Sequence, residues 1–350
     1  MNIFDYIDKY GNTTFEEKEF NEVDNLIFCS LSYLNFTYTS VNVNNHTIEY
    51  LGREYLKIHN FKDIKKLGIP QKNGYKVLRK VVNKKRYRDV LLHNYVYSAD
   101  ITKQFSAMMF KISDDLEYIC FEGTDELVSG WKEDFELSYH FPIPSQKDAI
   151  KYANKYIKIT GPDVIIGGHS KGGNLALVAA MYTKQLKQFR IKKVYSNDGP
   201  GLRTNEFKSG EYRRIKRKFV HFVPDYSPVG IILRNDIMDF VKTDKKSVLS
   251  HAIVYWQIED DHVVRTTQSK KTEKLQAYLL NWLKTHTDKE KEHIVKTVFG
   301  VFEQNGIRAF TELINVINIK NVLSNIMNID DETKDMLIDL FKYAIIDKEE

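Results

Sequence analysis

Residues 164–173 read VIIGGHSKGG, and this stretch constrains the fold more than any other part of the chain. Ser170 is the central residue of the pattern G-x-S-x-G, which it forms with Gly168 and Gly172. The run DVIIGG before it is short and wholly apolar, as expected for a strand that is buried on both faces of a parallel sheet. The segment after it, GGNLALVAAMYTKQLKQF, is rich in Ala and Leu and favours a helix. The stretch therefore predicts a strand, a sharp turn and a helix.

The turn at Ser170 has two interpretations. In a nucleophile elbow the central serine takes a strained conformation, and glycine is needed two positions away because a side chain there would collide across the turn. The alternative is a small residue in an ordinary glycine-rich turn. The buried strand and the helix favour the nucleophile, since a helix N-terminus offers amide N–H groups to a developing oxyanion.

Strands and helices alternate on both sides of this turn. The runs QFSAMMFKI and LEYICFEG predict a hairpin around residues 113–115, and QKDAIKYANKYIKIT has the apolar spacing of a helix. Further along, KKVYSND, KFVHFV and AIVYWQI predict three more strands, with the helical segment TNEFKSGEYRRIKRK between the first two. This alternation indicates the α/β class with a mostly parallel central sheet.

Changes in periodicity divide the chain into two parts. Residues 1–285 form one predicted domain, in which 1–100 are an N-terminal helical and mixed extension, including the helix EVDNLIFCSLSYLNF, and 101–285 are the catalytic core. Residues 286–350 form a helical C-terminal module with the segments DKEKEHIVKTVFGVFEQNG, RAFTELINVI and ETKDMLIDLFKYAI. Its apolar residues are interpreted as core, with a partner-binding groove as the alternative.

The charge of the chain argues against nucleic-acid binding. The chain has 350 residues and a formal charge of +5, from 52 basic and 47 acidic residues, which is too small an excess to predict nucleic-acid binding. The basic run YKVLRKVVNKKRYR at 75–88 is interpreted as a solvated face, with contact to phosphate or an anionic membrane as the alternative.

Neither a metal nor an organic cofactor is expected. Cys29 and Cys120 lie in apolar runs without the paired spacing of a zinc or redox site, so they are predicted to be buried thiols. The first 20 residues lack a basic segment followed by an apolar run, and no long apolar span occurs. We therefore expect a cytoplasmic protein.

A serine nucleophile needs a base and an acid, which follow it along the chain in the order Ser, Asp or Glu, His in α/β hydrolases. Asp225 follows the predicted strand KFVHFV, and His251 precedes the run AIVYWQI, so Ser170, Asp225 and His251 are the expected set. Asp198 in SNDGPG also follows a predicted strand and remains the alternative acid, although a loop lining the pocket explains it equally well.

Three other histidines compete with His251. His169 lies inside the elbow and is expected to point away from Ser170, which favours a packing or hydrogen-bonding role. His221 lies within a predicted strand, and His262 follows the last predicted strand, where it is the more serious rival. The remaining need is an oxyanion donor: Gly123 permits a tight turn after the strand LEYICF, which would let Thr124 act through its N–H or hydroxyl together with the Lys171 N–H.

Four segments taken together resemble the α/β hydrolase superfamily and, within it, the class 3 lipase-like branch. FEGTDELVSGWKEDF looks like its oxyanion turn followed by a Trp and an Asp, IGGHSKGGNLALVAA like its elbow, VHFVPDYSPVG like its acid loop and SHAIVYW like its histidine loop. The segments KGGN and NDGPG are closer still to a bacterial, Mbeg-like family of unknown function, and the resemblance covers about residues 15–285. It implies Ser170 as nucleophile, His251 as base, Asp225 as its orienting acid, and Thr124 with Lys171 around the oxyanion.

Two residues depart from the lipase pattern. Glu122 stands before the oxyanion glycine, and Lys171 follows the serine where an apolar residue is usual. A buried acid and a lysine near the pocket argue against a purely apolar cleft for triacylglycerol and leave the substrate open.

The leading hypothesis is a serine hydrolase that cleaves an acyl ester or thioester of a small molecule or lipid through an acyl-enzyme. One rival is a non-catalytic partner-binding protein on the same scaffold, because fold does not fix function. The other is a peripheral membrane lipase that weakly associates with anionic lipid through residues 75–88 and 213–218.

Overall fold

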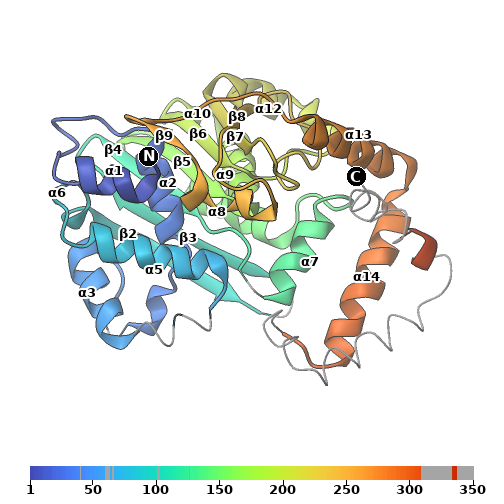
Figure 1. The fold of residues 1–350 in the computed structure, drawn as a ribbon, viewed down its shortest axis with the longest axis horizontal. Coiled ribbons are helices and arrows are strands. Elements are labelled where there is room, and N and C mark those ends of the chain that lie inside the picture. Colours follow the sequence, from blue (N-terminus) through green and yellow to red (C-terminus); the bar gives the residue numbers. More distant parts are fainter. Residues whose placement is uncertain are drawn as a thin grey trace.

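A computed structural model of the protein describes residues 1–39, 41–59, 64, 67–100, 103–125, 127–308 and 333–336. Its centre is an eight-stranded sheet in which the spatial order of the strands is their order along the chain (Figure 1). Pairings from β1 to β4 are antiparallel and those from β4 to β8 are parallel. The strands are β1 (His46–Thr47), β2 (Leu91–Ala99), β3 (Gln104–Lys111), β4 (Leu116–Phe121), β5 (Asp163–His169), β6 (Ile191–Asn197), β7 (Phe219–Pro224) and β8 (Asp239–Val241), with a separate hairpin of β9 (Ile258–Glu259) and β10 (His262–Val263).

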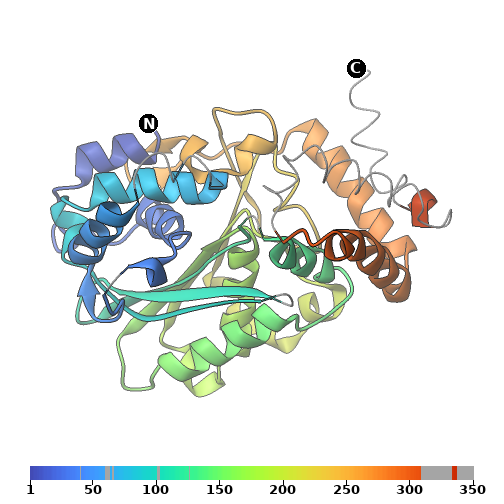
Figure 2. The same ribbon diagram turned by 90° about the horizontal axis from the view of Figure 1, so that it is seen from below.

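Helices cover both faces of this sheet and one of its ends. The N-terminal helices lie on one face and α8, α9 and α12 on the other, as Figure 2 shows from below. The helices are α1 (Ile3–Tyr10), α2 (Glu22–Leu31), α3 (Ile48–Ile58), α5 (Ile69–Val81), α6 (Lys85–Arg88), α7 (Val128–Glu136), α8 (Pro144–Tyr156), α9 (Lys171–Tyr182), α10 (Gln185–Gln188), α11 (Thr204–Phe207), α12 (Gly210–Ile215), α13 (Lys270–Thr285) and α14 (Asp288–Gln304). Short 3-10 turns are η1 (Phe36–Tyr38), η2 (Lys216–Lys218), η3 (Val248–His251) and η4 (Ile253–Tyr255).

Alternation along the strands produces two hydrophobic cores. Met108 and Phe110 of β3 face the N-terminal helices, whereas Ala107 and Met109 of the same strand face α8 and α9. Successive side chains of a strand point to opposite faces, so a strand that is apolar at every position is buried on both. The continuous apolar runs of the sequence are therefore explained by helices on both faces of the sheet.

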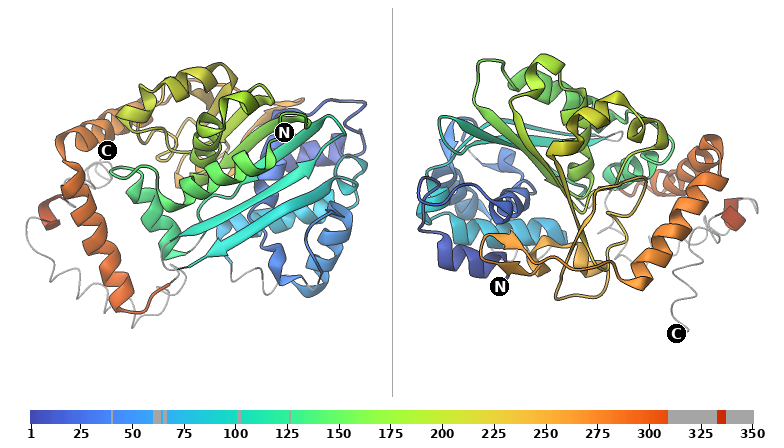
Figure 3. Two further views of the ribbon diagram at one scale, coloured as in Figure 1. Left: turned by 180° about the vertical axis from the view of Figure 1, so that it is seen from behind. Right: turned by 90° about the horizontal axis from the view of Figure 1, so that it is seen from above.

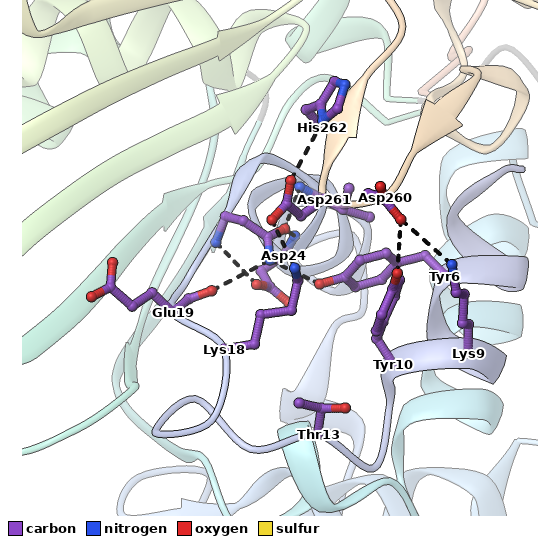
Figure 4. Close-up of polar contacts among 12 residues, drawn as sticks. Tyr6, Lys9, Tyr10, Thr13, Lys18, Glu19, Asp24, Asp260, Asp261 and His262 are labelled. Carbon is purple, nitrogen blue, oxygen red and sulfur yellow. Dashed lines mark hydrogen bonds and ion pairs between the residues drawn. The ribbon is translucent and has the colours of Figure 1, made fainter.

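The N-terminal extension is part of the domain and is tied to the β9–β10 hairpin. Tyr10 Oη donates to Asp260 Oδ1 (2.9 Å), and Lys18 Nζ lies 2.8 Å from Asp261 Oδ2 (Figure 4). Deeper in the fold, Arg86 forms a fully buried ion pair with Asp24 (2.6 Å) and donates to main-chain carbonyls around residues 13–19. One of the basic residues at 75–88 is thus a core residue rather than part of a solvated face.

The C-terminal helices α13 and α14 lie at the opposite end of the molecule from α1, in both views of Figure 3. Helix α14 packs its apolar residues Val295, Phe299 and Phe302 against Val128 of α7. The segments RAFTELINVI and ETKDMLIDLFKYAI, predicted as helices, lie almost wholly outside the described residues. None of the described helices combines the length and apolar character that a membrane crossing requires.

Most predicted elements are confirmed, and one is wrong. The hairpin, the strands at 163–169, 191–197 and 219–224 and the helices around them are present. The run AIVYWQI was expected to be a strand, but it forms η4 and reaches strand geometry only at Ile258. It is apolar because Ile253 and Trp256 are buried in the core that the N-terminal helices complete, not because it belongs to the sheet. The strand, turn and helix order around a mostly parallel sheet is the α/β-hydrolase fold.

Candidate active site

Ser170 occupies a strained turn between β5 and α9. Its φ of 58° and ψ of −133° lie in a region that residues with a side chain rarely adopt. The turn is held by two main-chain bonds, Ser170 N–H to Asn197 O (3.0 Å) and Gly173 N–H to Ser170 O (2.9 Å). A Cβ on Gly168 would lie 2.2 Å from the Gly172 main chain, so glycine is required there. The geometry is that of a nucleophile elbow.

His251 and Asp198 form a close pair beside this turn. His251 Nδ1 lies 2.6 Å from Asp198 Oδ2, and the Asp198 side chain is fully buried. The carboxylate also accepts hydrogen bonds from Ser227 Oγ (2.6 Å) and the Gly230 N–H (2.9 Å). A carboxylate in this position accepts a hydrogen bond from Nδ1–H, and in the neutral form of the imidazole Nε2 is then the acceptor. The pair has the geometry in which a carboxylate orients an imidazole ring.

Asp225, the acid expected from the sequence, is placed elsewhere. It follows β7 as predicted, but its N–H continues the ladder to Val241 O (3.1 Å) and its carboxylate accepts from Thr243 Oγ1 (3.4 Å). The reason is the strand order: β6, which ends before Asp198, is hydrogen-bonded directly to β5, whereas β7 lies one strand further from Ser170. His251 therefore meets Asp198, the alternative acid.

A cavity of about 660 Å³ joins these residues. Ser170, His251 and Thr124 lie on its wall, and α13 and α14 close the far side with Leu275, Leu279, Trp282, Leu283, Ile294 and Val295. Ser170 and His251 both line the cavity but are not hydrogen-bonded to each other. A bond between nucleophile and base is often long or absent until substrate binds.

The expected oxyanion residues lie at the mouth of the elbow. Gly123 approaches the elbow so closely that a Cβ there would lie 2.4 Å from His169 O and 3.1 Å from Ser170 Cβ. The next residue, Thr124, lines the cavity, and no protein acceptor for its N–H or for that of Lys171 is present in the described part of the chain. Two main-chain donors beside a serine can stabilise a developing oxyanion.

The Thr124 hydroxyl has a different partner. Thr124 Oγ1 donates to Asp134 Oδ2 of α7 (2.5 Å), and burial raises the pKa of Asp134 to about 6, against the opposing effect of Lys171. Above that pH the ionised carboxylate holds the hydroxyl and fixes the Thr124 side chain. The sequence showed Asp134 only as part of a resemblance, because the nine residues between it and Thr124 give no sign that α7 brings it back to Thr124.

The two departures from the lipase pattern do not reach the cavity. Lys171 Nζ is fully buried, 3.0 Å from Glu133 Oε2 and 3.2 Å from the Gln104 carbonyl oxygen. Glu122 is buried beneath the turn, where desolvation and the nearby Asp125 raise its pKa well above the usual range. Neither side chain lines the cavity. Glu122 and Lys171 therefore supply no argument about the polarity of the cavity.

His169 supports His251 from behind. Its Nε2 lies 2.7 Å from the His251 carbonyl oxygen, and its Nδ1 lies 2.7 Å from Tyr33 Oη. A carbonyl only accepts, so Nε2 carries the proton and Nδ1 accepts from the tyrosine. Burial lowers the pKa of His169 well below its usual value, and the nearby His251 lowers it further. A neutral His169 thus holds the main chain of His251, and the two imidazole rings lie against each other at a tilt, with centroids 4.4 Å apart.

The other two histidines are not part of the site. His221 is fully buried within β7, where desolvation lowers its pKa to about 4. His262, the rival base, lies on the β9–β10 hairpin with Nδ1 3.4 Å from Asp261 Oδ1, among the contacts that bind the N-terminal helices (Figure 4). Neither lines the cavity that contains Ser170.

Comparisons with known proteins find structural neighbours and a matching sequence family. Among solved structures, the crystal structure of M37 lipase is 14% identical, with a TM-score of 0.37, over 75% of this chain and 80% of the lipase chain. A comparison with curated protein sequences finds no match. Residues 81–300, which contain the elbow, Thr124, Asp198 and His251, match the sequence model described as Mbeg1-like. The chain therefore belongs to the Mbeg1-like family.

Proposed function

We propose that the protein is a serine hydrolase that cleaves acyl esters or thioesters with long apolar acyl chains. The observation that carries the proposal is that a strained Ser170 and His251, which is paired with Asp198, both lie on the wall of one largely apolar cavity. Ser170 would attack the carbonyl carbon as His251 Nε2 takes its proton, and Asp198 would stabilise the imidazolium. The Thr124 and Lys171 N–H groups would bind the oxyanion, and His251 would then protonate the leaving group.

The second half of the reaction needs no further group. Water would enter the site, His251 would take its proton, and attack on the acyl-Ser170 ester would release the acid and restore the serine. The cavity supports an acyl substrate because its lining from α13 and α14 is almost entirely aliphatic or aromatic. Trp131 and Phe135 of α7, which also line it, are 43% and 40% exposed and offer an apolar mouth to a lipid-like substrate.

Chain-length preference tests this proposal. With 4-nitrophenyl esters from acetyl to hexadecanoyl, kcat/KM is expected to rise about fourfold for each added methylene until the cavity is full, because each buried methylene contributes about 0.8 kcal/mol. Leu279→Trp is expected to move the optimum to shorter chains by filling the cavity. Leu186→Trp on α10 is the control, since Leu186 is 75% exposed and outside the cavity. A flat profile with acyl length would count against an acyl-binding role.

His169 is expected to act as a positioning residue. His169→Phe removes the bond to the His251 carbonyl while keeping an aromatic ring, and a misplaced base is expected to lower kcat about 10- to 100-fold with little change in KM. Tyr33→Phe, which removes only the donor to Nδ1, is expected to have a smaller effect in the same direction. Steady-state kinetics beside thermal unfolding of each variant checks this: a loss of kcat that merely follows a loss of folded protein would contradict the positioning role.

A further inference from the structure

A second cavity of about 200 Å³ adjoins the first, where the junction of α13 and α14 meets the loops after β6 and β7. The two cavities share three lining residues, Ser138, Leu283 and Lys291. The first is apolar, but the second is lined by four basic side chains, those of Arg203, Arg234, Lys284 and Lys291. The apolar cavity therefore adjoins a basic one at these three residues.

Basic side chains outnumber acidic ones around this cavity. Of the described residues that line this cavity, Asp288 is the only acidic one, and it binds both Arg203 and Lys291 (3.2 Å to the lysine). Arg234 Nε donates to Thr204 Oγ1 (2.8 Å), a neutral partner, and Lys284 takes part in no ion pair with another described residue. Four basic side chains against one acidic side chain give the lining of this small cavity an excess of three positive charges.

Lys291 shows that the excess is not simply a solvated surface. Its side chain is only 8% exposed, whereas that of its partner Asp288 is 52% exposed and is shared with an arginine. Burial of an ammonium group is unfavourable unless it is paired and hydrogen-bonded. An anion in the cavity would supply further acceptors to these groups, and guanidinium groups pair well with the oxygens of phosphate.

We propose that this cavity binds a phosphate group carried by the substrate, so that the preferred substrates are acyl esters of a phosphorylated alcohol rather than neutral esters. This inference rests on the proposed hydrolase function for its catalytic meaning, because the phosphate is placed relative to an ester bond at Ser170. The binding itself is independent of turnover. The same chemistry would accept free inorganic phosphate, which the experiment distinguishes.

Binding is measured on the Ser170→Ala protein, which cannot turn over the ligand. Two ligands with the same decanoyl chain are compared by calorimetric titration: 1-decanoylglycerol and 1-decanoylglycerol 3-phosphate, which differ only by the phosphate. The phosphorylated ligand is expected to bind about tenfold more tightly or better, with an advantage that shrinks as salt is raised because the contact is ionic. Equal affinities would overturn the proposal.

Substitutions then locate the contact. Arg234→Gln together with Lys284→Gln is expected to reduce the phosphate advantage to about twofold or less; neither residue has an ion pair to lose, so the fold should be preserved. Lys289→Gln is the matched control. Lys289 is an exposed basic residue in the first turn of α14, close in sequence to Lys291, but it does not line the cavity. An advantage that persists in the double variant would overturn the assignment to this cavity.

Two further measurements complete the experiment. Binding of inorganic phosphate distinguishes a free-phosphate site from a substrate site, and hydrolysis of the two esters distinguishes the phosphate proposal from the hydrolase proposal. If inorganic phosphate binds but the phosphorylated ester has no advantage over the neutral one, the site is a free-phosphate site and the substrate proposal is wrong. In the wild-type protein, the ratio of kcat/KM for the two esters should favour the phosphorylated ester. Hydrolysis of both at equal rates would overturn the inference alone, whereas failure to hydrolyse either, despite selective binding of the phosphorylated ligand, would overturn the hydrolase function alone.

Discussion

Replacing Ser170 by alanine is expected to lower kcat for ester hydrolysis by about 10⁶-fold, which is the size of loss found when a triad serine is removed. The substitution deletes only the hydroxyl that would form the acyl-enzyme and leaves the cavity intact. The measurement is the steady-state release of 4-nitrophenol from a decanoyl ester, compared with the background rate in buffer. Burst kinetics of the wild-type protein, absent from the variant, would show the same acyl-enzyme directly.

The matched control is Ser113→Ala. Ser113 lies in the turn between β3 and β4, away from the cavity, so its loss is expected to change kcat by less than about twofold. Calorimetric unfolding of both variants confirms that each is folded. If Ser170→Ala retained activity within tenfold of the wild type, Ser170 would not be the nucleophile.

Replacing Asp198 by asparagine is expected to lower kcat about 10⁴-fold, the loss known for the equivalent change in a Ser-His-Asp triad. Asparagine preserves the shape of the side chain, but its amide can donate toward His251 Nδ1 and favour the wrong tautomer. Asp225→Asn, at the acid position expected from the sequence, should change kcat less than about threefold, because Asp225 bonds to Thr243 rather than to His251. A pH profile of kcat/KM for each variant completes the comparison.

The opposite order of effects would reject the pairing seen in the structure. A large loss in Asp225→Asn with little loss in Asp198→Asn would show that the histidine loop moves to β7 in the active protein. Asp198 is fully buried and accepts several hydrogen bonds, so its replacement also affects stability. Kinetics are therefore measured well below the unfolding temperature of each variant, so that a loss of rate is not a loss of folded protein.

The elbow could be predicted from sequence because its requirements are local. The glycines around Ser170, the apolar β5 and the Ala-rich α9 lie within one short stretch, and each is needed by the backbone geometry of that stretch. The buried strands were predictable for the same reason, since a run of apolar residues flanked by turns is a signal within a few positions. The strand, turn and helix at residues 163–182 could therefore be predicted without reference to the rest of the chain.

The acid could not be decided from sequence, because it depends on how a loop closes. Asp198 and Asp225 each follow a strand, and only the path of the η3 loop, which brings His251 back over β6, selects between them. The order of the residues along the chain was a poor guide to the acid. Asp225 follows β7, which lies two strands from β5, whereas Asp198 follows β6, which is paired directly with β5 and ends nearer Ser170. The choice is a tertiary property.

Long-range contacts explain the remaining differences. Tyr10 and Asp260 are 250 residues apart, and so no local pattern could show that the N-terminal helices pack on the β9–β10 hairpin. The same packing buries AIVYWQI without making it a strand, and it places Tyr33 against His169. The basic cavity likewise needs residues from α13, α14 and two loops, which are brought together only by the fold.

The central claim, that Ser170 is an activated nucleophile, is tested most directly with a fluorophosphonate probe. The protein is incubated with the probe, digested, and the modified residue is identified by mass spectrometry, with Ser170→Ala and His251→Ala treated in parallel. We expect a single adduct on the peptide that contains Ser170, strongly reduced in His251→Ala and absent from Ser170→Ala. A wild-type protein that remains unlabelled, with detergent present to admit the probe, would contradict the claim and leave a scaffold that binds without catalysis.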